Sequence, residues 1–211
     1  VVVGSGTRVF LLSPAGSSGR RAEILLRDVA AFDLARRLRS SEGAPLGEAF
    51  SFLSGLYFRG KLTYANRFAP GASFVITSCS GLLPPEARVR RDDLQRYARV
   101  PIALSESAYR RPFVRDARRL FRSMPPDAAV VLLGSIATDK YCGVLLEIYG
   151  ARLLFPSEFV GRGDMSRGGL LLRAARDGRE LDYVPVATAV RHGPRPPKLD
   201  PSTRVPAGED R

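Results

Sequence analysis

Tryptophan is absent from the 211-residue sequence, which also has only two cysteines, two methionines and one histidine. Two cysteines, Cys79 and Cys142, are too few for a disulfide framework or a cysteine-based metal site. A single histidine, His192, argues against histidine-based catalytic triads and against zinc chemistry. We therefore expect reduced thiols, no metal and no cofactor.

Long hydrophobic runs are also missing. The longest aliphatic stretches, such as residues 130–133, fall far short of the roughly 20 apolar residues that span a bilayer. The opening residues 1–4 lack the basic start and the apolar stretch of an export signal. These features predict a cytoplasmic monomer that does not act at a membrane.

Charge of one sign dominates what is present. The chain has 33 Lys and Arg against 21 Asp and Glu, a net charge of +12, and only three of its cations are lysines. Segment 88–122 alone contains eleven arginines and four acidic residues. Guanidinium groups bind phosphate bidentately, so this balance predicts a polyanionic partner, with nucleic acid ahead of a membrane surface. Biased base composition of the gene is the alternative explanation for the arginines.

Hydrophobic runs alternate with stretches of helical periodicity, which predicts an α/β fold. We expect a three-layer α/β/α sandwich around a mostly parallel sheet of four to five strands. The expected strands are residues 8–13, 73–77, 128–133, 152–155 and 181–186. The expected helices are 20–39, 50–64, 112–123, one ending at 149, and 166–177. Residues 1–190 should form one domain and 191–211 a flexible proline-rich tail.

Small-residue loops follow the expected strands and should converge at one edge of the sheet. The first loop offers Ser13, Ser17 and Arg20 to a phosphate, although a plain turn fits equally well. Further on, Tyr57 beside Arg59 has the pairing that stacks on bases, although aromatic residues at helical spacing more often belong to a core.

An arginine stripe lies on the expected helix 112–123. Phe113 and Ala117 would face the core while Arg111, Arg115 and Arg118 face outward. A solvated face is the ordinary explanation for such a stripe, but its uniform sign favours a surface that follows phosphates.

The loop at 155–169 is the most informative stretch. Four glycines, two serines, two carboxylates and two arginines stand between a strand and a helix. Polar, glycine-rich loops on a rigid scaffold are where functional residues concentrate.

From residue 130 to residue 186 the order of motifs resembles that of uracil-DNA glycosylases. A strand that ends in Gly134-Ser135 precedes a helix, and Phe155-Pro156-Ser157 is similar to the family's His-Pro-Ser loop. A downstream Arg-Gly follows at residues 162–163 or 167–168, and residues 182–186 resemble the family's acidic-aromatic-Pro-Val ending. Residues 74–78 and 11–14 match the positions of its base-recognising strand end and first catalytic loop.

The resemblance implies a uracil-DNA-glycosylase-like fold and a DNA glycosylase that flips a modified or damaged base and hydrolyses its N-glycosidic bond. A carboxylate would stabilise the positive charge that builds on the sugar, with Asp164 the first candidate and Glu158 the second. An ion pair with an arginine of the same loop is the alternative role of Asp164. The flanking phosphates would be held by Ser157, Arg162, Ser166 and Arg167. The base would stack on Phe155 or Tyr57, and Ser78 would read its edge.

Three positions depart from the family pattern. Phe155 replaces the loop histidine, Thr77 or Ser78 replaces the base-reading Asn, and no Asp or Asn stands between Ser13 and Arg20 to activate water. A non-catalytic module that binds DNA or tRNA therefore stays open, as does an N-glycosidase acting on free nucleosides or nucleotides. A glycosylase without the uracil motifs would suit repair or defence against modified phage DNA.

Overall fold

A six-stranded sheet forms the centre of the computed structural model, which describes residues 7–197 and 199. The strand order is β4-β3-β1-β6-β7-β8. The strands are β1 Arg8–Leu12, β3 Ser73–Ile76, β4 Leu82–Leu83, β6 Ala129–Leu133, β7 Leu153–Pro156 and β8 Tyr183–Pro185. β3, β1, β6 and β7 run parallel, whereas the edge strands β4 and β8 pair antiparallel with their neighbours.

The parallel strands are aliphatic because both of their faces are covered. Every residue of β6 is buried, and β1 pairs along it from Arg8 opposite Ala129 to Leu12 opposite Leu133. Continuous apolar runs are typical of parallel strands between two helical layers, whereas a half-exposed strand alternates. This composition makes β1 and β6 the centre of the core.

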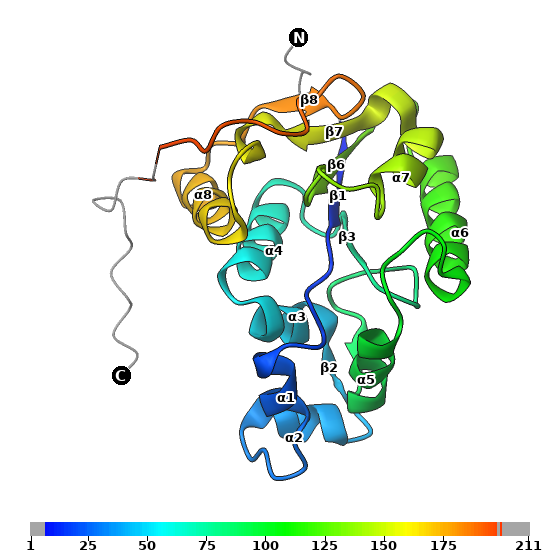
Figure 1. Ribbon diagram of the computed structural model, residues 1–211, viewed down its shortest axis with the longest axis vertical. Helices are drawn as coiled ribbons and strands as arrows, with labels where there is room; N and C mark the ends of the chain where they lie inside the picture. The colour runs from blue at the N-terminus through cyan, green and yellow to red at the C-terminus, as the bar shows by residue number, and fades with distance from the viewer. Residues whose placement is uncertain (1–6, 198, 200–211) are drawn as a thin grey trace.

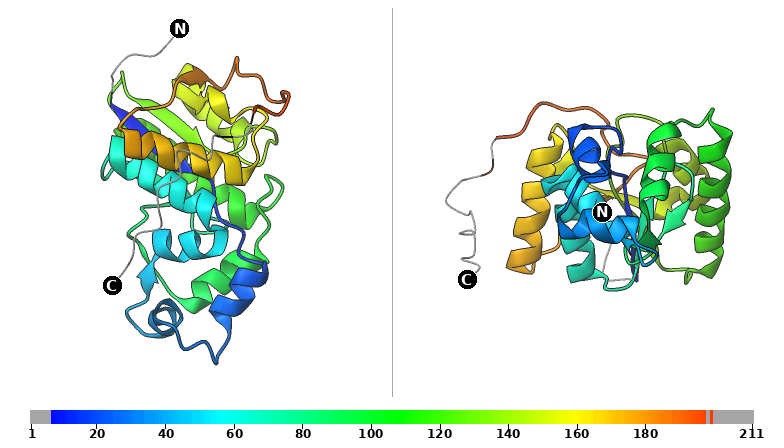
Figure 2. Two further views of the ribbon diagram at one scale, coloured as in Figure 1. Left: turned by 90° about the vertical axis from the view of Figure 1, so that its left-hand side faces the viewer. Right: turned by 90° about the horizontal axis from the view of Figure 1, so that it is seen from below.

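Helices lie on both sides of this sheet. In Figure 1, α4 and α8 cover one face and α6 and α7 the other, and Figure 2 shows the same layers from two further directions. These helices are α4 Leu56–Phe68, α6 Ser107–Ser123, α7 Cys142–Tyr149 and α8 Asp164–Asp177. Short 3-10 turns at Gly150–Arg152 (η1) and Ser157–Phe159 (η2) flank β7. The α/β class is confirmed.

The expected sheet differs from the observed one at its edges. Four to five mostly parallel strands were predicted, but the sheet has six strands and is mixed. β4 returns antiparallel beside β3 after a turn at Gly81, where φ is +71°. Glycine adopts this conformation without strain. β4 has only two residues, which is too short for a periodic pattern to reveal.

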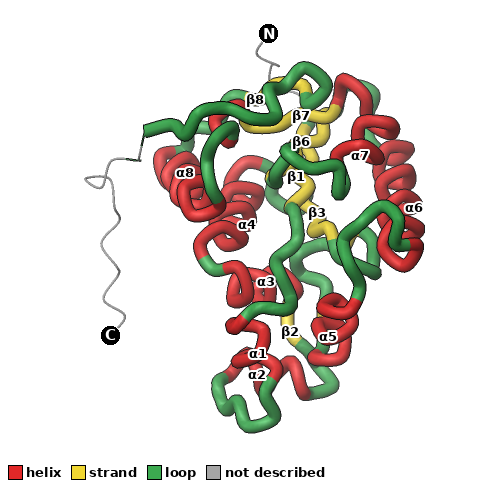
Figure 3. Tube along the Cα trace, in the orientation of Figure 1, coloured by secondary structure: helices red, strands yellow, loops and turns green. Residues whose placement is uncertain are grey.

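A smaller lobe lies beyond the carboxyl ends of the parallel strands (Figures 1 and 3). It consists of α1 Arg20–Leu26, α2 Asp33–Arg39, β2 Ala44–Pro45, α3 Leu46–Ser54, β5 Arg88–Val89 and α5 Arg91–Arg99. The prediction of one helix over 20–39 is wrong because the chain turns between α1 and α2. The Arg39 guanidinium donates to the carbonyls of Arg27 and Ala30, at 3.2 and 2.6 Å, and holds this turn. Phe32 then stacks on Phe52 with ring centroids 5.3 Å apart.

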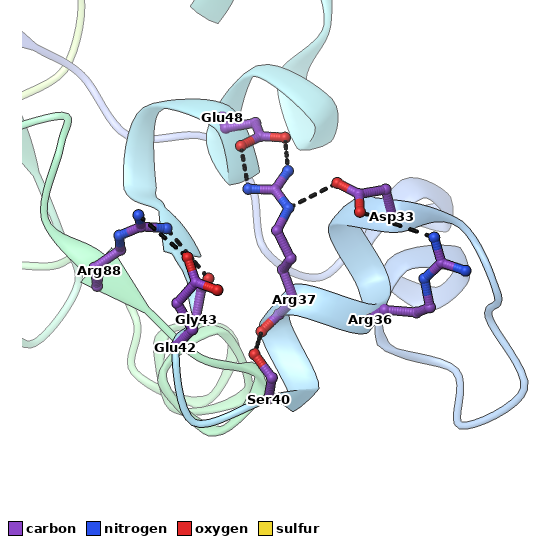
Figure 4. Close-up of polar contacts among 8 residues, drawn as sticks. All are labelled: Asp33, Arg36, Arg37, Ser40, Glu42, Gly43, Glu48 and Arg88. Carbon is purple, nitrogen blue, oxygen red and sulfur yellow. Dashed lines mark hydrogen bonds and ion pairs between the residues drawn. The ribbon is translucent and has the colours of Figure 1, made fainter.

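Ion pairs fasten α2 to α3 in this lobe (Figure 4). The Arg37 guanidinium pairs with both oxygens of Glu48, and its Nε donates to Asp33 Oδ2 at 2.7 Å. Nearby, Arg88 Nη2 lies 3.4 Å from Glu42 Oε1, beside the antiparallel pair of β2 and β5. These ion pairs connect the elements of the lobe that lies beyond the carboxyl ends of the parallel strands.

The helix expected over 50–64 begins at Leu46 and is divided into α3 and α4 at Gly55, where φ is +62°. Two more helices begin earlier than the sequence predicts. α6 starts at Ser107 rather than at Pro112, because the Glu106 side chain accepts the Ala108 N–H at 3.0 Å and caps a longer helix. α8 starts at Asp164 rather than at Ser166, which places that carboxylate in the first helical turn.

The predicted tail is described only in part, since residues 198 and 200–211 lie outside the described residues. Arg191 Nη1 donates to Asp139 Oδ1 at 2.9 Å, and Arg162 Nη1 donates to the Pro197 carbonyl at 3.3 Å. This first part of the tail contacts the loop that precedes α8. Its flexibility stays a prediction.

Candidate functional site

The order of the parallel strands locates a binding position. The chain passes from β1 to β3 on one side and then places β6 on the other side of β1. In such sheets ligands bind at the carboxyl ends of the strands where the direction of winding changes. Here that point lies between the loop after β1, which begins at Ser13, and the loop after β6, which begins at Gly134.

A cavity of about 230 Å³ opens beside this point. Residues 14–18 after β1, Ser78 after β3 and Lys140 after β6 form one side of it, and Phe50 of α3 and Tyr97 of α5 form the other. Sites for drug-sized ligands occupy about 300–1,000 Å³. The cavity therefore suits a small ring such as a single base better than a complete nucleotide.

Two glycines bring α8 against α4, the helix that carries Lys61. A Cβ on Gly60 would lie 2.7 Å from the Gly168 carbonyl oxygen, and a Cβ on Gly168 would lie 2.7 Å from the Leu56 carbonyl oxygen. The two backbones therefore touch, which no larger residue would allow. This crossing sets the first turn of α8, with Asp164 and Arg167, against the first two turns of α4.

Lys61 is the most unusual residue of the site. It is 1% exposed, and its Nζ donates to the Ser13 carbonyl at 2.6 Å and to Ser13 Oγ at 2.9 Å. The same Nζ lies 4.3 Å from the centre of the Tyr57 ring and 4.9 Å from that of Phe58. Burial lowers the pKa of Lys61 to about 7, the Asp164 carboxylate opposes this, and Arg167 adds to it. A lysine with this pKa is partly neutral at physiological pH.

Ser13 lies between Lys61 and the loop after β6. A Cβ on Gly134 would be 2.8 Å from the Ser13 Cβ and 3.0 Å from the Tyr141 hydroxyl, so only glycine fits there. The Tyr141 hydroxyl accepts the Ser135 N–H at 3.2 Å. Burial raises the pKa of Tyr141, and the Ser135 N–H, contact with the Ser13 side chain and the charge of Arg167 partly offset this.

Tyr57 and Arg167 face this group from the α4 and α8 side. Tyr57 is 6% exposed, and among the described residues its hydroxyl has no hydrogen-bond partner of good geometry. Burial raises the pKa of Tyr57, and the nearby Arg167 guanidinium offsets a part of this. Arg167 donates through Nε and Nη2 to the Phe159 carbonyl at 3.2 and 3.1 Å, which fixes its position.

Asp164 is the carboxylate nearest to this cluster. It occupies the first turn of α8, with its side chain 73% exposed and its Oδ1 3.8 Å from Arg167 Nη1. Partial positive charge at a helix N-terminus favours an ionised carboxylate. The structure thus brings Ser13, Tyr57, Asp164 and Arg167 of the predicted site together.

Other predicted residues lie farther along the same loop. Ser157 donates its N–H to the Asp182 carbonyl at 3.0 Å, next to the start of β8. Burial raises the pKa of Glu158, and Asp182 adds to this, while Arg162 and Arg179 oppose it. Arg162 donates to Ser166 Oγ at 3.2 Å, and both residues are half-buried.

The residues predicted to contact the base occupy different surroundings. Phe155 is 1% exposed, and its ring meets Phe159 edge-on with centroids 5.8 Å apart, so it is closed to a ligand in this structure. Ser78 lines the cavity and donates its hydroxyl to the Tyr97 carbonyl at 2.9 Å. Ser78 is therefore at the cavity wall, whereas Phe155 would first have to leave the core to meet any ligand.

The predicted phosphate contacts form two groups. Ser17 lines the cavity, and Arg20 and Arg59 are exposed on α1 and α4. The second group lies on α6, where a groove of about 530 Å³ is formed by Leu104, Ser105, Ser107, Val114 and four arginines, Arg110, Arg111, Arg115 and Arg118. Of these arginines only Arg115 has an ion pair, with Asp116, among the described residues.

The groove and the cavity are close neighbours in the chain. The cavity is lined by residues up to Ile102, and the groove begins at Leu104. Only Ala103 separates the two sets of lining residues in the sequence.

Lys61 and Tyr141 are absent from the set of residues that the sequence suggested. Lys61 could have been found, because Tyr57, Lys61, Tyr64 and Ala65 form one helical stripe in which a lone lysine interrupts apolar residues. Tyr141 has no comparable sequence pattern. It directly precedes the short helix α7, and the loop after β6 sets its position.

No family model matches the chain, and neither a curated protein nor a solved structure is similar to it. Within residues 7–197 and 199, no group of three or more His, Cys, Asp or Glu side chains is placed to hold a metal ion. In the same part of the chain no helix is both long and apolar enough to cross a bilayer.

Proposed function

We propose that the chain is a DNA glycosylase that accepts a flipped base in the cavity at the end of β1 and hydrolyses its N-glycosidic bond. The observation that supports this most directly is a cavity of about 230 Å³ beside the point where the direction of winding changes. Enzymes that act on a base move it out of the stack into such a pocket.

The chemistry of bond cleavage fits Asp164. Breaking the bond leaves positive charge on the sugar, which a carboxylate close to C1′ stabilises. Asp164 lies in the first turn of α8 with an exposed side chain 3.8 Å from Arg167, and we expect it to face a sugar whose base occupies the cavity. Glu158 is the second candidate, since its raised pKa would let it donate a proton to a leaving base.

The partner is DNA held along the α6 groove. Arg110, Arg111 and Arg118 have no acidic partner among the described residues, and the net charge of the chain is +12. Such a surface binds phosphates without reading sequence, which leaves recognition to the cavity.

An abasic-site assay tests the proposal. The purified chain is incubated with single- and double-stranded oligonucleotides that contain normal, deaminated, alkylated or hypermodified bases, and alkaline cleavage reports base loss. We expect one substrate to be cleaved, and Asp164→Asn to reduce its cleavage by about 100-fold or more with unchanged DNA binding. Asp177→Asn, at the far end of α8, is the matched control. Equal loss in both variants would contradict the role of Asp164.

A nucleic-acid-binding module without catalysis is the second candidate. The α6 groove supports it, because four arginines around about 530 Å³ would bind phosphates whether or not the cavity is catalytic. Salt-sensitive DNA binding without cleavage of any substrate would favour this function.

A further inference from the structure

A buried serine and lysine adjoin the cavity, and the proposed glycosylase chemistry does not yet use them. Lys61 and Ser13 are 1% and 6% exposed, and their Nζ and Oγ atoms are 2.9 Å apart. Ser13 directly precedes residues 14–18, which line the cavity. The first loop has no Asp or Asn that could activate water.

The surroundings of Lys61 disfavour a charged amine. Within the described part of the chain, its hydrogen-bond partners are the Ser13 carbonyl and hydroxyl alone, and its other neighbours include the Tyr57 and Phe58 rings. The charged groups that act on it are Asp164 and Arg167 of α8, and Asp164 is 73% exposed. A buried ammonium without a close counter-ion is expensive, so the neutral amine is favoured once the pH exceeds about 7.

A neutral Lys61 has a lone pair and can receive a proton from Ser13. The amine keeps one N–H on the Ser13 carbonyl, at 2.6 Å, while the hydroxyl turns its proton toward Nζ across the 2.9 Å contact. A serine hydroxyl beside a neutral lysine is an established arrangement for activating a nucleophile.

We propose that Lys61 is the proton acceptor for Ser13 and that the pair is the general base of the hydrolytic site. The catalytic step rests on the proposed function. Water loses a proton to Ser13 Oγ as the Ser13 proton moves to Lys61 Nζ, and the water oxygen bonds to C1′. The C1′–N bond breaks, its electron pair leaves with the base, and the base takes a proton from solvent. Lys61 then returns its proton to solvent.

The first experiment needs no substrate. The chain has only three lysines, so selective ¹³Cε labelling gives three signals, and Lys61→Arg identifies the one from Lys61. We expect that signal in the wild type to titrate with a midpoint near pH 7, and the midpoint to move in Ser13→Ala. A midpoint near 10, the value of a solvent-exposed lysine, would overturn the proposal.

The second experiment uses the substrate found in the abasic-site assay. Lys61→Met keeps the length of the side chain and removes the proton acceptor, and we expect at least a 100-fold lower rate with DNA binding unchanged. The wild-type rate should rise with pH through about 7, and Ser13→Ala should remove that dependence. Lys61→Arg tests a purely structural role, since arginine donates hydrogen bonds but cannot accept a proton.

The outcomes separate the two proposals. Full activity of Lys61→Met or Lys61→Arg would overturn the base role even if base excision is real. Arg67→Met, at the other end of α4, is the control for substitution on this helix. If the wild type releases no base but Lys61 titrates near pH 7 in a Ser13-dependent way, the glycosylase proposal fails and the proton-accepting pair stands.

Discussion

Replacing Lys61 by methionine should change how the stability of the protein depends on pH. In the unfolded chain a lysine keeps its proton up to a pH of about 10.4. In the folded chain burial lowers the pKa of Lys61 to about 7. Between pH 7 and 9 the unfolded state therefore binds more protons than the folded state, so stability rises with pH in this window.

The size of this effect follows from the two pKa values. Integrating the proton difference from pH 7 to pH 9 gives a gain of about 2 kcal/mol from Lys61 for the wild type. Other groups also titrate in this range, and the burial that raises the pKa of the Cys142 thiol to about 11 acts in the opposite direction. These contributions cancel when the wild type is compared with Lys61→Met at each pH.

Urea unfolding at pH 7, 8 and 9 measures this difference. The wild type should gain about 2 kcal/mol relative to Lys61→Met across the window, which is about 0.7–1 M in the urea midpoint for a slope of about 2–3 kcal/mol/M. The free energy of unfolding of Arg67→Met, a variant on the same helix, should change with pH as that of the wild type does. If the stability of Lys61→Met also changed with pH in the same way as that of the wild type, Lys61 would be charged in the folded state. The proposal of a proton-accepting pair would then be wrong.

Two further substitutions test the packing and the partner. Gly168→Ala should cost about 2–3 kcal/mol in urea unfolding, because the new Cβ would lie 2.7 Å from the Leu56 carbonyl oxygen and neither backbone can move alone. Gly143→Ala, where nothing lies within 4 Å, should cost nothing or stabilise, and an equal loss in both variants would contradict the close crossing of α4 and α8. Arg118→Gln should reduce the slope of log affinity against log salt for DNA by about one, measured by fluorescence anisotropy. Arg67→Gln is the charge-matched control on α4, which lies on the other face of the sheet from α6, and an unchanged slope for Arg118→Gln would remove the α6 groove from the interface.

The main strands could be predicted from the sequence because they are buried on both faces. Residues 129–133 form an unbroken aliphatic run, and the strand, its glycine-serine ending and the following helix all occur where the sequence suggests. The short edge strands could not be predicted in the same way. β4 consists of Leu82 and Leu83 alone, which is too short to show the alternating hydrophobic pattern of a strand. Its pairing with β3 depends on the turn at Gly81.

The candidate site was predictable only as a set of loops. The alternation of strands and helices was enough to place Ser13 and Ser78 at one edge of the sheet, and the cavity lies there. The sequence could not show which loop side chains enter the core. Phe155 occupies a position that belongs to a loop motif in the resembled family. Here it is a buried residue of β7 whose ring packs against Phe159.

Lys61 shows why a contact between distant segments is hard to read from sequence. Its two acceptors belong to Ser13, 48 positions earlier in the chain. Only the phase of α4 and the close crossing with α8 turn the lysine inward rather than toward solvent. The apolar stripe of α4 could indicate an inward-facing lysine, but nothing in the sequence names Ser13 as its partner.

A charged residue in an apolar stripe is nonetheless informative once the fold is known. A methionine at position 61 would fill the same space without the cost of burying an amine, so packing alone does not account for the lysine. Sequences break such local rules mainly at functional or strained positions. The Lys61 amine contacts Ser13, which directly follows β1 at the position where ligands bind in sheets of this strand order. The residues that follow Ser13 line the cavity. Cluster, cavity and topology are three independent properties of the chain, and their coincidence at one place is the strongest reason to look for chemistry there.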